Sequence, residues 1–72
     1  MKWHRYAPYI LESSPCDGVY ARMRIYQRLV KDSQAVYYTI HGQQNGVLVK
    51  LARAETWGAA MKLAEELNVP AS

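Results

Sequence analysis

The segment from residue 20 to residue 28 reads Tyr20-Ala21-Arg22-Met23-Arg24-Ile25-Tyr26-Gln27-Arg28. Successive side chains of a β-strand point to opposite faces, so a strand here separates small and apolar residues from arginine and tyrosine. The apolar side extends to Val19 and Leu29. This alternation predicts a sheet with one buried face and one basic, aromatic face in water.

Two hairpins are expected around the next strand. Asn45-Gly46 is the pair that best supplies the two positive-φ residues of a type I′ hairpin turn. It predicts the pairs Gln44–Val47, Gly42–Val49, His41–Lys50, Ile40–Leu51, Thr39–Ala52 and Tyr38–Arg53. A loop at residues 31–34 predicts Leu29–Val36, Arg28–Tyr37, Tyr26–Thr39, Ile25–Ile40 and Arg24–His41. Both hairpins place apolar residues on the same face, which a slip of one residue would expose.

The remaining elements are a short strand and a helix. Residues 7–12 are expected to form an edge strand, because Pro8 lacks a ladder donor. Thr56 can cap a helix in which Ala60, Leu63, Ala64 and Leu67 recur at helical spacing, before Asn68 and Pro70 end it. Gly58 is explained by close approach to the sheet. The expected fold is α+β: a four-stranded antiparallel β-meander with one C-terminal α-helix packed on one face, in a single domain of residues 1–72.

Length and composition exclude several classes of protein. The 72 residues include one cysteine, so no internal disulfide can form, and no Cys/His cluster suggests zinc. No apolar run approaches the roughly 20 residues that span a bilayer, and the first residues lack a signal peptide's apolar stretch. We therefore expect a cytoplasmic protein without membrane contact. The net charge of +3 permits acidic partners without requiring them.

Residues that could carry catalysis are scattered. His4 and His41 have no other ligand type at metal-binding spacing, and Cys16 lies in a turn-rich loop as a simple thiol. Glu12, Asp17 and Asp32 are interpreted as turn residues, and three further carboxylates belong to the solvated side of the helix region: Glu55, Glu65 and Glu66. The sequence therefore predicts a protein that is not an enzyme and holds no metal or cofactor.

The candidate site is the basic, aromatic face of the sheet. It is expected to comprise Tyr20, Arg22, Arg24, Tyr26, Arg28, Tyr37, His41 and Lys50. Arginine and tyrosine supply much of the binding energy at protein interfaces, and both also contact phosphates and unpaired bases. A third interpretation is that these side chains only cover the sheet by stacking on each other. The modest charge and the absence of an RNA-recognition signature favour protein over nucleic acid.

The aromatic segment near the N-terminus runs from Trp3 to Tyr9. Contiguous exposed apolar surface is costly, so this segment is expected to complete the core, with contact to a partner as the alternative. An edge strand beside it could also pair with a second copy of the chain, which makes a homodimer a further expectation.

Two patterns carry a resemblance to a known group of proteins. They are Trp3-x-Arg5-Tyr6-x-Pro8-Tyr9 near the start and Thr56-x-x-x-Ala60-x-x-x-Ala64-Glu65 near the end. Together with the short strands, they resemble small phage and prophage proteins of the counter-defence, anti-CRISPR-like kind, built from a sheet and one helix. The resemblance implies a stoichiometric inhibitor that binds a host protein or ribonucleoprotein complex in the cytoplasm of a bacterial host cell.

Overall fold

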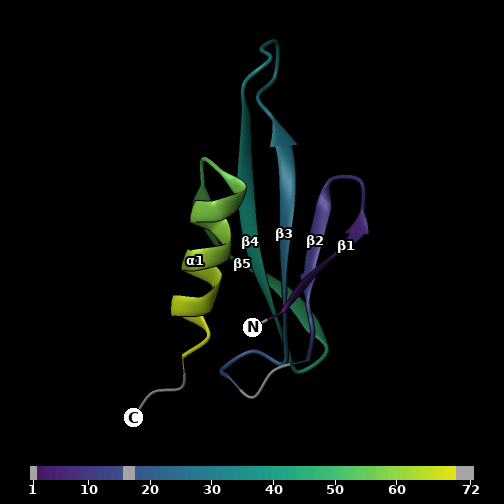
Figure 1. Cartoon of the computed structure of the whole chain (residues 1–72), viewed down its shortest axis with the longest axis vertical. Coiled ribbons are helices and arrows are strands. Elements are labelled where there is room, and N and C mark those ends of the chain that lie inside the picture. Colours follow the sequence, from purple (N-terminus) through teal and green to yellow (C-terminus); the bar gives the residue numbers. More distant parts are fainter. Residues whose placement is uncertain (1, 16–17, 70–72) are drawn as a thin grey trace.

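The computed structural model describes residues 2–15 and 18–69. It contains five strands and one helix: β1 Trp3–Ala7, β2 Ile10–Ser13, β3 Arg22–Leu29, β4 Val36–Gln44, β5 Val47–Ala54 and α1 Trp57–Leu67. The strands form one antiparallel sheet in the order β1-β2-β3-β4-β5, and α1 packs on β3, β4 and β5 (Figure 1). The antiparallel sheet with a C-terminal helix is therefore confirmed. The described residues hold no helix of the length and apolarity needed to cross a membrane.

The N-terminal part of the sheet differs from expectation. Residues 7–12 were expected to form one strand, but the chain turns at Pro8 and Tyr9 and forms the β1–β2 hairpin. Proline fixes φ and lacks an N–H, so it suits a turn between strands better than a place within one. The sheet consequently has five strands rather than four. Trp3, at the start of β1, packs against the core.

The register of the β3–β4 hairpin matches every predicted pair, from Leu29–Val36 to Arg24–His41. The β4–β5 hairpin also begins as predicted, with Asn45 and Gly46 at φ of 54° and 79° in the turn. Beyond His41–Lys50, however, the register shifts by one residue, and three predicted pairs were wrong. The observed pairs are Ile40–Ala52, Thr39–Arg53 and Tyr38–Ala54.

The shift is a β-bulge at Leu51. A bulge places two residues of one strand opposite one residue of its partner. Here both Leu51 and Ala52 pack against the core, which strict alternation would forbid. The bulge therefore adds apolar contact beneath α1 and reverses the faces of the residues that follow it in β5.

The core lies between the sheet and α1. Met23, Ile25, Tyr38 and Ile40 of the sheet meet Ala60 and Ala64 of the helix, and all six are buried. Small alanines let the helix approach the sheet closely. Thr56 caps the helix as predicted, because its side-chain oxygen accepts a hydrogen bond of 3.0 Å from the Ala59 amide. The expected close approach at Gly58 was wrong, since a Cβ built there would meet nothing within 4 Å.

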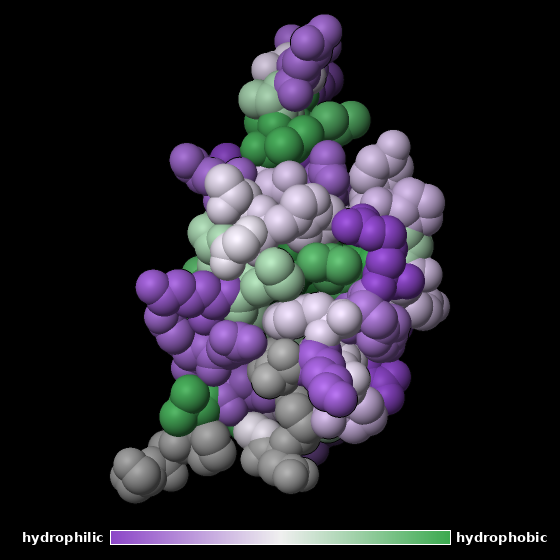
Figure 2. All heavy atoms as spheres, in the orientation of Figure 1, coloured by the Kyte–Doolittle hydropathy of each residue, from purple (hydrophilic) through white to green (hydrophobic). Residues whose placement is uncertain are grey.

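The β3–β4 hairpin projects beyond the helix and gives the molecule principal extents of 42 × 23 × 21 Å (Figure 1). Leu29, expected on the buried face, is 71% exposed because α1 does not extend over this end of β3 (Figure 1). Val19, also expected to be buried, precedes β3 and is exposed. Figure 2 shows hydrophobic atoms just below the hydrophilic tip of this projection. The apolar residues of the alternating pattern thus extend further along β3 than the part of the sheet that α1 covers.

Candidate functional site

The face of the sheet opposite α1 is uncovered by any helix, and we call it the open face. Strand alternation and register place these residues on it: His4, Tyr6, Ile10, Glu12, Arg22, Arg24, Tyr26, Arg28, Tyr37, Thr39, His41, Gln43, Leu48, Lys50 and Arg53. Five of these side chains are fixed cations, from arginine or lysine, and one is a carboxylate. The open face is therefore strongly basic, although the whole chain carries a net charge of only +3.

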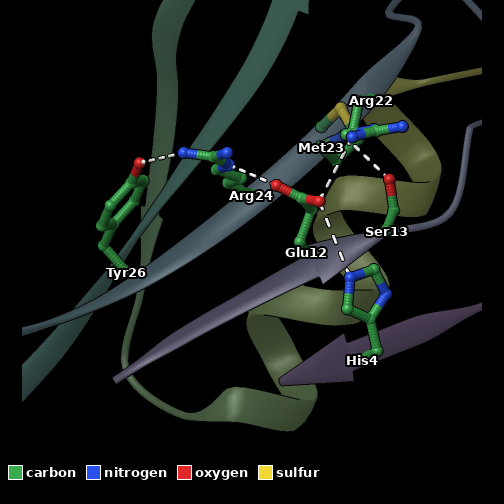
Figure 3. Close-up of polar contacts among 7 residues, drawn as sticks. All are labelled: His4, Glu12, Ser13, Arg22, Met23, Arg24 and Tyr26. Atoms are coloured by element: carbon green, nitrogen blue, oxygen red, sulfur yellow. Dashed lines mark hydrogen bonds and ion pairs between the residues drawn. The ribbon is translucent and has the colours of Figure 1, made fainter. Parts of the chain in front are cut away.

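One half of the open face is organised around Glu12, whose exposed fraction is only 4%. Its Oε2 accepts a hydrogen bond of 2.6 Å from Arg24 Nε, and its Oε1 lies 3.4 Å from Arg22 Nη1 and 3.6 Å from His4 Nε2 (Figure 3). We call these four residues the Glu12 cluster. They come from β1, β2 and β3, so the cluster ties three neighbouring strands together.

Arg24 is held from several directions within this cluster. Its Nε bonds Glu12, and its Nη1 donates to the Tyr26 hydroxyl at 3.2 Å (Figure 3). Its guanidinium also lies 4.5 Å from the centre of the Tyr6 ring. The hydrogen bonds to Tyr26 and then to Glu12 raise the pKa of Arg24 above its usual value, so it stays charged. Behind it, the buried Ser13 hydroxyl accepts a bond of 2.8 Å from the Met23 amide.

The other half of the open face lies on β3, β4 and β5. Arg28 lies over the Tyr26 ring at 5.0 Å, and Arg53 lies over the Tyr37 ring at 4.1 Å, both measured to the ring centre. His41 meets the edge of Tyr26, with ring centres 4.8 Å apart. We call these five residues the stacked cluster. Among the residues that the structure describes, none supplies a carboxylate within ion-pair distance of Arg28, Arg53 or Lys50.

The pKa of His41 reflects its burial and the positive charges around it. Its pKa is lowered from the usual 6.5, first by partial burial and then by the positive charges of Arg28 and Lys50. The ring nitrogen Nε2 lies 2.9 Å from the Thr39 hydroxyl. A neutral imidazole at neutral pH follows, as expected for a histidine among cations.

Seven of the eight candidate residues lie on the open face, and Tyr20 is the exception. It precedes β3, its amide donates to Asn68 Oδ1 at 2.6 Å, and its ring occupies the space where a Cβ of Gly42 would lie. Gly42 shares the helix-side face with Ile40, so Tyr20 packs on the side of the core. The prediction for Tyr20 was wrong because it applied strand alternation to a residue that precedes β3.

Sequence reasoning missed three residues of the two clusters: His4, Glu12 and Arg53. Glu12 was placed at the end of the expected strand 7–12 and its carboxylate was explained by a turn, but it lies in β2 directly opposite Arg24, where a cross-strand ion pair forms. Arg53 was paired with Tyr38 on the helix side, and the bulge turns it to the open face. Glu12 belongs to the strand that precedes the arginine-rich strand, and this place in the sequence could have indicated a cross-strand ion pair. Nothing in the local sequence indicates the bulge.

Two hollows lie beside residues of the open face. One of about 110 Å³ is lined by Arg22, Arg24, Gln43, Gly46 and Leu48, well below the roughly 300 Å³ at which ligand pockets begin. The other, of about 420 Å³, is large enough for a small ligand and is lined by Tyr9, Gln27, Arg28 and Leu29, so it lies at one edge of the open face rather than at its centre. Residues 2–15 and 18–69 contain no group of three or more His, Cys, Asp or Glu side chains that could hold a metal ion. Cys16 and Asp17, interpreted from sequence as loop residues, lie outside the described residues. The geometry suits contact with a surface.

No family model matches this chain, and no curated protein and no solved structure is significantly similar to it.

Proposed function

We propose that this protein is a non-enzymatic binding domain that docks a partner protein on its open face. The observation that carries the proposal is the preorganisation of that face. Its arginines are held in place before any partner arrives, by Glu12 in one half and by tyrosine rings in the other. Fixing a side chain in advance reduces the entropy lost on binding, and arginine and tyrosine are the residues most often found at energetic centres of interfaces.

The alternative is a nucleic-acid-binding protein using the same residues. Proteins that bind single strands offer aromatic rings on which bases stack. Here arginine side chains already lie over the rings of Tyr6, Tyr26 and Tyr37. A base would have to displace a guanidinium to reach these rings, which favours protein as the partner.

The narrower form of the proposal follows from the resemblance to small phage-encoded proteins. We propose a stoichiometric inhibitor of a host defence complex, acting in the bacterial cytoplasm by occupying a surface. Self-association through an edge strand is compatible with this role. Light scattering over a range of concentrations would show whether the protein self-associates.

Affinity capture from a bacterial lysate tests the proposal, with Tyr37→Ala as the test variant and Tyr9→Ala as its control. Tyr9 is 64% exposed in the β1–β2 turn, outside the open face although it lines a hollow with Arg28, so its variant removes the same side chain without disturbing the Tyr37–Arg53 pair. We expect the wild type and Tyr9→Ala to retain one protein in stoichiometric amount, and Tyr37→Ala to retain about tenfold less. Equal capture by both variants would place the interface elsewhere.

A further inference from the structure

The open face holds two kinds of arginine that differ in what a partner could gain from them. Arg22 and Arg24 already contact a carboxylate of their own chain, and Arg24 is bound at 2.6 Å. An incoming carboxylate would have to compete with Glu12, which is 4% exposed and fixed in β2. These two arginines are therefore poor anchors for a partner.

Arg28 and Arg53 are in the opposite situation. Each is exposed, each has its guanidinium carbon over a tyrosine ring, and neither has a carboxylate partner among the described residues. A guanidinium that is held by a ring, and not by a carboxylate, still has its N–H groups available for bidentate contact with a carboxylate. Because β3 and β5 flank β4, their backbones are separated by two strand spacings, roughly 10 Å.

Positive charge is also concentrated around the stacked cluster, because Lys50 lies directly opposite His41 and Arg28 lies over the Tyr26 ring that His41 contacts. Burial is the main cause of the lowered pKa of His41, and the charges of Arg28 and Lys50 lower it further. Their mutual repulsion is unfavourable in the free protein. Carboxylates placed over the cluster by a partner would relieve that repulsion and form ion pairs in the same step.

We infer that the partner presents an acidic protein surface, and that Arg28 and Arg53 select it, whereas Arg22 and Arg24 maintain the sheet. This inference rests on the proposed function and gives the chemistry of the partner. Phosphate would satisfy the same cations, but arginines lie over the Tyr26 and Tyr37 rings, so a base could stack there only by displacing a guanidinium. The occupant is therefore a protein whose contact residues are aspartate and glutamate.

Fluorescence anisotropy with defined probes tests the inference. The probes are two labelled 12-residue peptides, one with six Glu and one with six Gln at the same positions, and a 12-nucleotide oligothymidylate. We expect the Glu peptide to bind most tightly, with affinity that falls as salt rises. Arg28→Glu/Arg53→Glu should weaken binding of the Glu peptide at least about tenfold.

The matched control is Lys31→Glu/Lys62→Glu, which changes the net charge equally in the β3–β4 loop and on α1. It should change the affinity for the Glu peptide less than about twofold. Equal binding of the Glu and Gln peptides, tighter binding of oligothymidylate, or equal losses in both double variants would each overturn the inference. Thermal denaturation of each double variant confirms that it remains folded.

The proposed function can fail separately from this inference. If a captured protein is lost with Tyr37→Ala but retained by Arg28→Glu/Arg53→Glu, the open face is the interface and the acidic partner is wrong. If Tyr37→Ala captures as much as the wild type, docking on the open face is itself contradicted, whatever the peptides do.

Discussion

The two halves of the open face use the same residue type for different purposes. In the Glu12 cluster, arginine is neutralised by a buried carboxylate and joins strands. In the stacked cluster, arginine lies over tyrosine and keeps its charge unpaired among the described residues. The length of β2 accounts for the difference, because its pairing with β3 ends at Ile10–Tyr26 and leaves Arg28 without a neighbouring carboxylate. Local strand pairing, rather than residue type, separates structural from available arginines.

Removing the carboxylate should have the largest effect. Glu12→Ala leaves Arg22 and Arg24 close together with no counter-charge, and deletes the link among three strands. Because both arginines are partly solvated, we expect a loss of about 2 to 3 kcal/mol in the free energy of unfolding. Urea denaturation measures it. A loss below about 0.5 kcal/mol would mean that the cluster contributes little to stability.

The next largest effect is expected from reversing the charge of one arginine in each half of the open face and comparing the two losses of stability. Arg24→Glu places a second carboxylate against Glu12, so we expect it to lower the free energy of unfolding by about 1 to 2 kcal/mol. Arg28→Glu makes the same change on an exposed side chain, and we expect a change within about 0.5 kcal/mol. Thermal midpoints of the two variants make the comparison. Similar midpoints would remove the distinction between structural and available arginines.

Tyr26 joins the two halves, since its hydroxyl accepts from Arg24 while its ring carries Arg28. Tyr26→Phe keeps the ring and removes only the acceptor. We expect a loss of about 0.5 to 1 kcal/mol in the free energy of unfolding, with unchanged affinity for the Glu peptide. Weaker peptide binding in this variant would show that the halves are coupled in binding.

The smallest effect concerns protonation of His41. Its folded-state pKa lies below 6.5, so the unfolded chain takes up this proton first and stability falls as pH drops below about 6.5. His41→Gln removes that contribution. Between pH 7.5 and pH 5, the urea midpoint of wild type should therefore fall further than that of His41→Gln. Equal falls would show that the pKa of His41 is not lowered in the folded protein.

Local patterns predicted the centre of the sheet well. The loop at residues 31–34 together with the alternation in β3 predicted the β3–β4 register, and the Asn45-Gly46 turn predicted the start of the β4–β5 register. Thr56 likewise marked the start of the helix. These features depend on residues close in sequence, whose turn and capping preferences are strong.

The features that were missed depend on packing between distant residues. The bulge at Leu51 forms because two apolar residues can contact the core together, which no local pattern expresses. Tyr20 departs from the alternation because it packs over Gly42, and Glu12 is buried because Arg24 lies opposite it. The seven predicted residues of the open face were found from alternation and the two hairpin registers, but their division into two clusters required the pairing of β2 with β3.

The bulge in β5 has a consequence for how this surface can change in evolution. Every residue that follows Leu51 in β5 owes its face to one extra backbone position. Deleting a single residue at the bulge would move Arg53 from the open face to the side of the core, although Arg53 itself would not be substituted. The surface can therefore lose a cation through a change in chain length, and variants of this domain are best compared after alignment of their bulges.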